Sequence, residues 1–430
     1  MKTVCKLLAV SAITASIGIP VSSYATNGIF LIGYGAKARG MGGASIAMAK
    51  DSVDAAINPA AASYTGDRAD AGVMFFNPQV RGACCNSPDG EVSSAGFFVI
   101  PNLAGTMQYN EKINLGFSFM GYGGGGTEYR FNIFDSTNPN DKLGMEYSLA
   151  VMSPSAAYKI NDTQSVGVAL LIGIQRFRAF GLSPFRAFSQ APDFMGHNDY
   201  DWSFGGGLRL GWQGHFMNDN LKLGAVYQTK MQMSKFDKYK GLFANGGEMD
   251  VPGNVALGIA YKVMDDLTIA FDWQRTFYED VPAIGNRTLP ISVAAGDPNQ
   301  MGGSSGPGFG WENQDIFKLG AEYDFSEKWI FRAGVNYGKS PIRNDGGGEF
   351  EVNVISPAVA EWNLTAGGTY NLDEKQEISF ALLYSPRSTQ RGVIPPDDPS
   401  TPGDDLPFQD ETIVLEMRQY AFDISYGYKF

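Results

Sequence analysis

Few residues of this chain could support enzyme chemistry. Among 430 residues there are only two histidines, His197 in an expected loop and His215 near an expected short turn. This placement argues against a serine–histidine hydrolase. H-E-x-x-H does not occur in the sequence. We therefore expect no catalytic residues, no cofactor and no metal site.

A glycine run is the one segment that formally matches a nucleotide-binding motif. Residues 121–126 read GYGGGG and fit G-x-G-x-x-G. However, the run ends a strand-like segment and no helix pattern follows it, as a dinucleotide site requires. Glycines inside a strand weaken its pairing and permit a kink. The sequence thus predicts an irregular strand end here, or the flexible start of a loop.

Cys84 and Cys85 are adjacent, and apart from Cys5 they are the only cysteines. In an oxidising compartment they could form a vicinal disulfide or pair between molecules. The alternative is a loop staple or two inert thiols. No histidines cluster near them, so the spacing does not fit a zinc site.

Two segments expected to be loops, 177–194 and 231–249, are unusually apolar. Exposed apolar loops are costly unless they pack together or bind something. A mouth that captures hydrophobic compounds fits this composition, because such sites are mostly apolar. The alternative is that the side chains bury one another or contact lipid. The candidate substrate-binding residues are Phe180, Phe185, Phe188, Leu242 and Phe243.

The N-terminus and the charge exclude several classes of protein. Residues 1–25 have a basic start, an apolar stretch and a small-residue end, which predicts a cleaved signal peptide. The full chain has 33 basic and 45 acidic residues, a net charge of -12, and removal of Lys2 and Lys6 makes it -14. Nucleic acid is therefore not an expected partner. No later segment is long and apolar enough for a membrane helix.

The elements that position these residues are strands. The last eleven residues alternate: Tyr420, Phe422, Ile424, Tyr426, Tyr428 and Phe430 share one face, and small or polar residues share the other. Similar two-residue periods recur along the chain. About fourteen strands are predicted, with starts near Ala71, Gly96, Ile113, Met145, Ser165, Tyr200, Leu221, Asn254, Leu267, Asp315, Trp329, Glu361, Glu377 and Leu415.

Short and long connections alternate between these strands. Tight polar turns are expected at 110–112, 161–163, 218–220, 265–266, 326–328 and 373–375. Outer-membrane barrels sort their connections in this way, with short periplasmic turns and long extracellular loops. We therefore predict an all-β protein, a transmembrane antiparallel β-barrel over 69–430. The Ala- and Gly-rich segment 26–68 is expected to form a partly helical hatch (plug) inside it, or alternatively a periplasmic extension.

At this point the chain resembles the FadL family of outer-membrane transporters of long-chain fatty acids and hydrocarbons. The most specific similarity is GYGAKARGMGGASIAMAKDSVDAAINPAAAS, residues 33–63, and further matches are VPGNVALGIAYK from Val251 and the block from Asp315. The segment 355–362 and the glycines after the third strand depart from the family pattern. These departures leave the substrate open. The resemblance implies a fourteen-stranded barrel with a hatch, which passes hydrophobic molecules inward without ATP.

The resemblance also implies roles for particular residues. A kink in the third strand would open a lateral gap, and Gly121, Gly123 and Gly124 would shape it. Asn58 and Pro59 would form a hatch element near this gap; alternatively, Asn-Pro is an ordinary helix-stop and turn signal. An arginine at the upper end of the fifth strand would receive a carboxylate, which makes Arg176 the candidate. Strand parity instead directs Arg176 to the lipid side, unless a bulge intervenes.

The predicted function is passive uptake of fatty acids or similar hydrophobic compounds. Extracellular capture, passage into the lumen and lateral exit at the third strand would be its steps. The alternatives are a general or polar-solute porin and, with less support, a barrel enzyme acting on lipids. The expected location is the outer membrane of a Gram-negative-type bacterium. The expected partners are hydrophobic small molecules, membrane lipid and lipopolysaccharide, and the protein is expected to be a monomer.

Overall fold

The structure is a computed structural model, which describes residues 27–84, 87–135, 138, 141–196, 199–345, 349–393 and 412–430. The predicted signal peptide lies outside these residues. Cys85 and the side chain of Cys84 are also outside the described part, as is His197. The predicted disulfide therefore stays a prediction.

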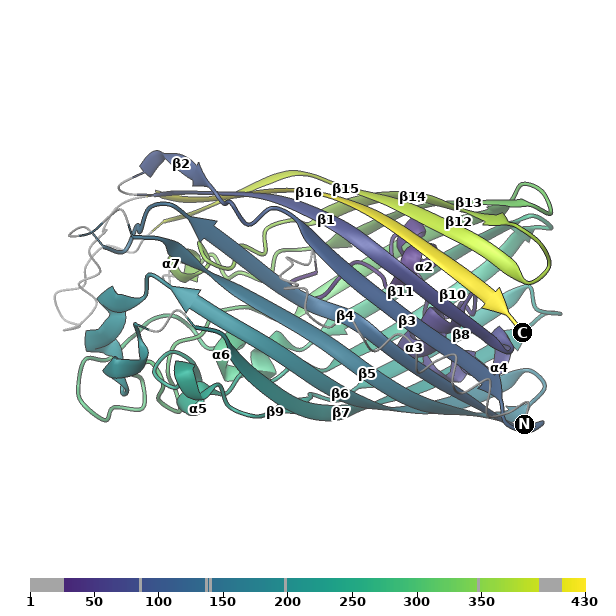
Figure 1. Ribbon diagram of the computed structural model, residues 1–430, viewed down its shortest axis with the longest axis horizontal. Helices are drawn as coiled ribbons and strands as arrows, with labels where there is room; N and C mark the ends of the chain where they lie inside the picture. The colour runs from purple at the N-terminus through teal and green to yellow at the C-terminus, as the bar shows by residue number, and fades with distance from the viewer. Residues whose placement is uncertain are drawn as a thin grey trace.

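The strands form one antiparallel sheet that closes on itself (Figure 1). Fourteen strands make the wall, while β2 (Ser87–Val92) and β9 (Gln232–Met233) are short additions within the described residues. The last wall strand pairs with the first, from Arg68 opposite Lys429 to Ala83 opposite Val414, and this pairing closes the barrel. The predicted fourteen-stranded barrel is confirmed. The wall strands are β1 (Arg68–Cys84), β3 (Phe98–Gln108), β4 (Ile113–Tyr129), β5 (Leu143–Asn161), β6 (Gln164–Phe180), β7 (Asp201–Phe216), β8 (Leu221–Gln228), β10 (Asn254–Met264), β11 (Leu267–Thr276), β12 (Gln314–Asp324), β13 (Trp329–Gly338), β14 (Trp362–Asn371), β15 (Gln376–Val393) and β16 (Thr412–Lys429).

The connections differ between the two rims. Short turns follow β3, β5, β7, β10, β12 and β14, at the rim where the C-terminus lies (Figure 1). Long segments join the strands at the other rim and carry short helices: η3 (Ser183–Phe188), η4 (Pro192–Phe194), η5 (Asp237–Tyr239), α5 (Ala244–Gly247), η6 (Tyr278–Asp280), α6 (Pro282–Gly285) and α7 (Glu349–Val352). None of the helices in the described ranges has the length and apolar character needed to cross a membrane.

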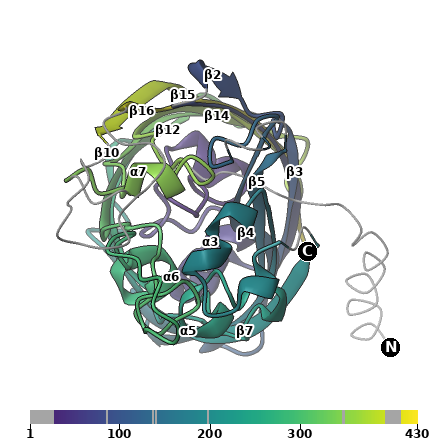
Figure 2. The same ribbon diagram turned by 90° about the vertical axis from the view of Figure 1, so that its left-hand side faces the viewer.

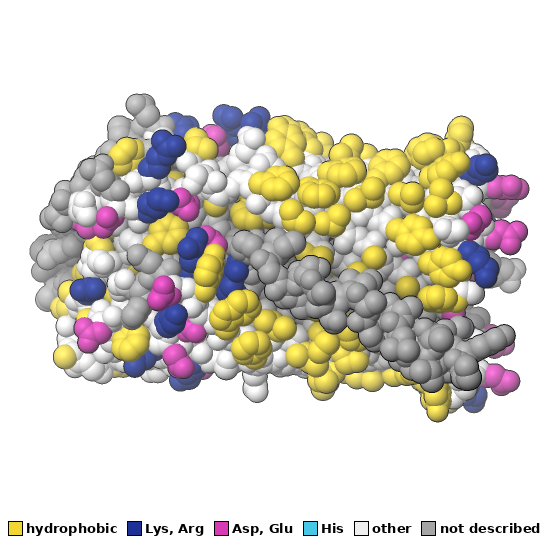
Figure 3. Space-filling model, viewed as in Figure 1, with side chains coloured by type: hydrophobic (Ala, Val, Ile, Leu, Met, Phe, Trp, Pro, Cys, Tyr) yellow, Lys and Arg dark blue, Asp and Glu magenta, His cyan; other side chains and the backbone are white. Residues whose placement is uncertain are grey.

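Alternation along the strands gives the wall two different faces. On β16 the side chains of Tyr420, Phe422, Ile424 and Tyr426 are each about 40% exposed, whereas Asp423 between them is fully buried. On the face shown in Figure 3, such outward apolar side chains form a belt across the middle of the barrel, with charged residues towards both ends. The belt matches the lipid-facing surface of an outer-membrane barrel.

Residues 27–66 lie inside the barrel (Figure 2). They contain α2 (Gly35–Gly40), α3 (Ser52–Ile57), η2 (Pro59–Ala61) and α4 (Ala62–Thr65). The side chain of Asp51 caps α3 by accepting from the amides of Val53 and Asp54. Small residues let this segment approach the wall closely. A Cβ on Gly42, which has a φ of 67°, would lie 2.6 Å from the carbonyl oxygen of Val335.

Candidate functional site

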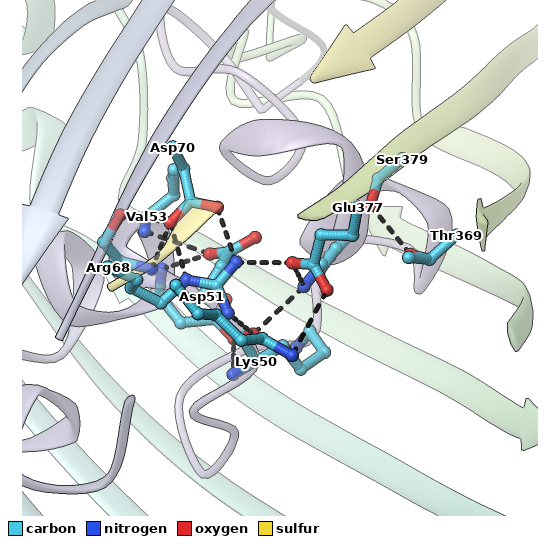
Figure 4. Close-up of polar contacts among 12 residues, drawn as sticks. Lys50, Asp51, Val53, Arg68, Asp70, Thr369, Glu377 and Ser379 are labelled. Carbon is cyan, nitrogen blue, oxygen red and sulfur yellow. Dashed lines mark hydrogen bonds and ion pairs between the residues drawn. The ribbon is translucent and has the colours of Figure 1, made fainter. Parts of the chain in front are cut away.

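Ion pairs join the N-terminal segment to the wall near the rim of short turns (Figure 4). Glu377 of β15 accepts from Lys37 at 2.5 Å and also pairs with Arg68. Arg68 in turn makes two contacts with Asp70, at 2.6 and 2.8 Å. Arg39 of α2 pairs with Asp423 of β16. We call these six charged residues the floor of the lumen, and all six side chains are at most 6% exposed.

Asn58 and Pro59 pack against the wall formed by β5, β6 and β7. The Asn58 amide donates to the carbonyl oxygens of Ile46 at 2.8 Å and Trp212 at 3.1 Å. A Cβ on Gly211 would lie 2.1 Å from the Asn58 oxygen, so only glycine leaves room there. The structure thus ties this pair to β6 and β7 rather than to the glycine run of β4. Its role in gating stays a prediction.

The wall is interrupted between β3 and β4. Their pairing begins at Gln108 opposite Asn114 and stops at Asn102 opposite Met120, although β4 continues to Tyr129. Beyond this point, β3 pairs with β1 and with no other strand of the described residues. Nearer the rim of long loops, the segment before β3 is again hydrogen-bonded to β4, where Ser94 N donates to Glu128 O at 2.9 Å. Residues 121–127 of β4 are therefore not paired with β3, although they remain beside β5. We call this stretch, together with the facing residues 98–101 of β3, the gap.

The glycine run brings β4 into contact with the N-terminal segment at the gap. The register with β5 shifts between Gly121 and Gly123, and residues 122–127 are all buried. The backbone of Gly123 forms a bridge with Phe30, and Gly124 N donates to Ile29 O at 2.9 Å. Gly121, Gly123 and Gly124 therefore lie where β4 is no longer paired with β3 but remains paired with β5.

Tyr122 links β4 to β7 and β8. Its hydroxyl donates to Gln228 Oε1 at 2.9 Å and accepts from Arg209, which lies on β7. Its ring stacks on Tyr34, with centroids 4.9 Å apart, and Tyr34 donates its hydroxyl to Tyr122 O at 2.9 Å. One side chain thus connects the gap, the N-terminal segment and β7.

A cavity beside Tyr122 contains two buried cations. Arg209 and Lys318 both line it and are 3% and 7% exposed. Arg209 is bonded to Ala56 O, the Tyr122 hydroxyl and Gln228 Oε1, and Lys318 donates to Gln274 Oε1 at 2.8 Å. No carboxylate of the described residues lies within ion-pair distance of either cation. The rest of this cationic cavity is mixed, with apolar side chains such as Phe30, Ile57 and Val226 beside polar ones such as Asn254 and Gln274.

Arg176 does not face the lumen. It lies between Gln175 and Phe177, which are fully or almost fully buried on the inner face, and β6 keeps its register with β7 through this region. Its guanidinium lies over the rings of Tyr200 and Trp202, at 4.1 and 5.8 Å. The expectation that Arg176 receives a carboxylate in the lumen is therefore wrong, because no bulge reverses the strand's alternation.

The sequence did contain a signal for the cations that face inward. Arg209 stands between Leu208 and Leu210, both about half exposed, and Lys318 stands between two outward residues, Phe317 and Leu319. Successive side chains of a strand point to opposite faces, so a cation between two lipid-facing residues must point into the lumen.

The apolar loop residues pack against one another at the mouth. Phe243 lies 4.8 Å from Phe177, centroid to centroid, and Phe185 lies 4.9 Å from Phe134. Tyr239 joins them and donates its hydroxyl to Asp199 O at 2.8 Å; burial raises the pKa of Tyr239 to about 12. Phe188 and Leu242 are partly buried against the same cluster, and Phe180 is 8% exposed near Arg178. In this state the side chains bury one another, which was the alternative to an open groove.

These features define a class of protein: an outer-membrane β-barrel channel, filled by its own N-terminal segment and interrupted at one seam of its wall. A family model described as outer membrane protein transport protein (OMPP1/FadL/TodX) matches residues 18–415, so the chain belongs to this family. The predicted family and outer-membrane location are confirmed. Membership identifies a transport protein and not an enzyme.

Solved structures share the fold at low sequence identity. The toluene transporter TodX of Pseudomonas putida has a TM-score of 0.67 and 18% identity, covering 93% of this chain and 99% of its own. The toluene transporter TbuX of Ralstonia pickettii has a TM-score of 0.62, also at 18% identity, with coverage of 93% and 99%. A Pseudomonas aeruginosa FadL homologue has a TM-score of 0.67 at 16% identity, with coverage of 94% and 100%. No curated protein sequence matches the chain.

Proposed function

We propose that this protein takes up hydrophobic compounds passively and releases them sideways through the gap between β3 and β4. Transport of hydrophobic compounds fits its family and the toluene transporters that share its fold. The observation that carries the lateral step is the loss of β3–β4 pairing beyond Met120, where the buried glycine run of β4 contacts the N-terminal segment instead. The driving force would be the gradient of the compound and its burial from water.

The charged floor supports a sideways exit. A hydrophobic compound that continued towards the short turns would have to separate buried ion pairs such as Arg39–Asp423. Breaking a buried pair without replacement costs several kcal/mol. At the gap, by contrast, the neighbouring side chains include Ile100 and Phe98, both buried and apolar. The floor also argues against the porin alternative, because ion pairs occupy the place of a water-filled path.

The cationic cavity supports a ligand with an anionic head. Arg209 has no ion-pair partner among the described residues, and Lys318 faces the buried Asp272 across the β11–β12 pairing without forming an ion pair, so an incoming carboxylate would compensate their charge. A guanidinium suits this role because it stays charged and can bind both oxygens. We propose that Arg209 and Lys318 hold the head of a fatty acid while apolar neighbours such as Ile57 contact its chain. The outward Arg176 suits the expected contact with lipopolysaccharide phosphate.

Replacing Arg209 by Gln is expected to weaken laurate binding by about tenfold or more, because hydrogen bonds to a charged group contribute about 1.5–3 kcal/mol. Binding of dodecanol should change little, since it carries no charge. Equilibrium binding to the purified barrel measures both. Lys318→Met should act in the same direction, which guards against a folding defect at one position.

Arg176→Gln is the matched control, because it removes a guanidinium from the outer face of the same barrel. It should leave laurate binding unchanged. Equal laurate affinity in the wild type, Arg209→Gln and Lys318→Met would contradict the carboxylate site while leaving the lateral exit open. The lateral exit itself is tested by joining β3 to β4 covalently, which should stop uptake.

A further inference from the structure

A second cavity lies next to the gap and differs in charge from the first. It is lined by Gly124 and Gly125 of β4, Tyr147 of β5, Ile29 of the N-terminal segment, and Trp311 and Met249 from the long loops. Its lining residues include no charged side chain. We call it the neutral cavity. Phe30 lines the cationic cavity and forms a β-bridge with Gly123. The next two residues of β4, Gly124 and Gly125, line the neutral cavity, so the two cavities are neighbours.

Tyr147 brings an unsatisfied polar group to this cavity. It is 1% exposed and lies opposite Gly125 in the β4–β5 register, so no side chain from that position covers it. Its hydroxyl is buried and has no hydrogen-bond partner among the described residues. Buried hydroxyls are nearly always hydrogen-bonded, so an exception calls for an explanation.

Two neighbouring tyrosines show the contrast. Tyr129 lies on β4 and, like Tyr147 on β5, is buried; it donates its hydroxyl to Val354 O at 3.0 Å. Tyr278 donates to Asn27 O at 2.6 Å and accepts from Ile29 N at 3.2 Å. Both hydroxyls hold loops or the N-terminal segment in place. Tyr147 has no such task, which leaves its hydroxyl free for a ligand.

We propose that the neutral cavity is a second binding site, in which Tyr147 selects uncharged hydrophobic compounds that carry one hydrogen-bonding oxygen. The inference rests on the proposed transport function and names a substrate class for it. A carboxylate is excluded because burying an ion without a counter-charge is prohibitively costly. A compound with a hydroxyl or carbonyl oxygen is favoured because it satisfies the phenol, whereas a pure hydrocarbon leaves the phenol unpaired.

Entry to the neutral cavity requires a local shift of the N-terminal segment. Gly28 and Ile29 form one side of the cavity. They are tied to the surroundings by the bond from Gly124 N to Ile29 O and by the bond from Ile29 N to the Tyr278 hydroxyl. Withdrawal of these residues breaks two hydrogen bonds and enlarges the site beside the gap. The two cavities would thus offer separate places to anionic and to neutral compounds.

The test compares p-cresol with p-xylene, in which a methyl group replaces the hydroxyl, in the wild type and in Tyr147→Phe. We expect the substitution to weaken p-cresol binding by about tenfold, the equivalent of one hydrogen bond. Binding of p-xylene should stay within about twofold or become tighter, because the unpaired hydroxyl is gone. Equilibrium dialysis with labelled compounds measures both, and heat-modifiable gel mobility verifies that the barrel is folded.

Tyr129→Phe is the matched control, since its hydroxyl already has a protein partner; the ratio of the two affinities should not change. An equal loss of both compounds in Tyr147→Phe, or no change in either, would overturn the selective role of the hydroxyl. So would failure of the folded wild type to bind p-cresol. The proposed function fails on a different result, namely uptake that continues when the gap is crosslinked.

Discussion

A disulfide between β3 and β4 at the base of the gap is expected to reduce uptake of hydrophobic compounds by about tenfold or more, because a lateral opening that cannot move cannot pass its substrate. The positions are Ile100→Cys and Gly121→Cys. A Cβ atom on Gly121 would lie 3.6 Å from that of Ile100, within the range of about 3.5–4.5 Å found in disulfides. Cys84 and Cys85 are first changed to Ser, so that only the new pair can form.

Uptake of a labelled fatty acid by intact cells, before and after reduction, measures the effect. Reduction should restore transport. The control is a second disulfide on the same two strands, Gly105→Cys with Phe117→Cys, where the strands already pair directly. It should leave uptake unchanged. Equal uptake with the gap pair oxidised and reduced would show that the compound leaves by another route.

Removing Arg39 is expected to loosen the N-terminal segment and to open the barrel to ions. In Arg39→Ala the carboxylate of Asp423, which is fully buried, loses its only ion-pair partner among the described residues. Breaking a buried pair in this way typically costs about 3–5 kcal/mol. Arg39 also donates to Gly33 O at 2.8 Å, so a second anchor is lost. Denaturant unfolding and ion conductance in planar bilayers measure the two consequences.

The double variant Arg39→Met with Asp423→Leu removes both charges of this pair, so that no unpaired charge stays buried between the N-terminal segment and β16. Replacing both partners by apolar residues is often close to neutral. It should therefore recover most of the stability and the low conductance. If Arg39→Ala conducts no more than the wild type and unfolds at the same denaturant concentration, the floor is not what seals the barrel. High conductance of the wild type itself would favour the porin alternative.

Much of the barrel was predictable because its strands face two different media. Lipid on one side and a polar lumen on the other impose a two-residue period, which placed β4, β8, β10, β11 and β13 at their observed first residues. The same rule correctly directed Arg176 outward and the polar residues of β16 inward. The short turns were recognisable because tight connections require a few polar residues in sequence.

The site depended on contacts that no local pattern encodes. The glycines of β4 indicated an irregular strand, but only the pairing of β3 with β1 alone shows that a gap results. Parity places Arg209 and Lys318 in the lumen, yet whether a buried cation has a counter-charge depends on residues far away in sequence. The floor joins Arg39 to Asp423 and Lys37 to Glu377. The sequence alone thus determined the barrel and its orientation of side chains, because solvent and lipid act on each residue locally. The tertiary structure decided which charges meet and where β3 and β4 stop pairing, because these depend on distances between distant segments.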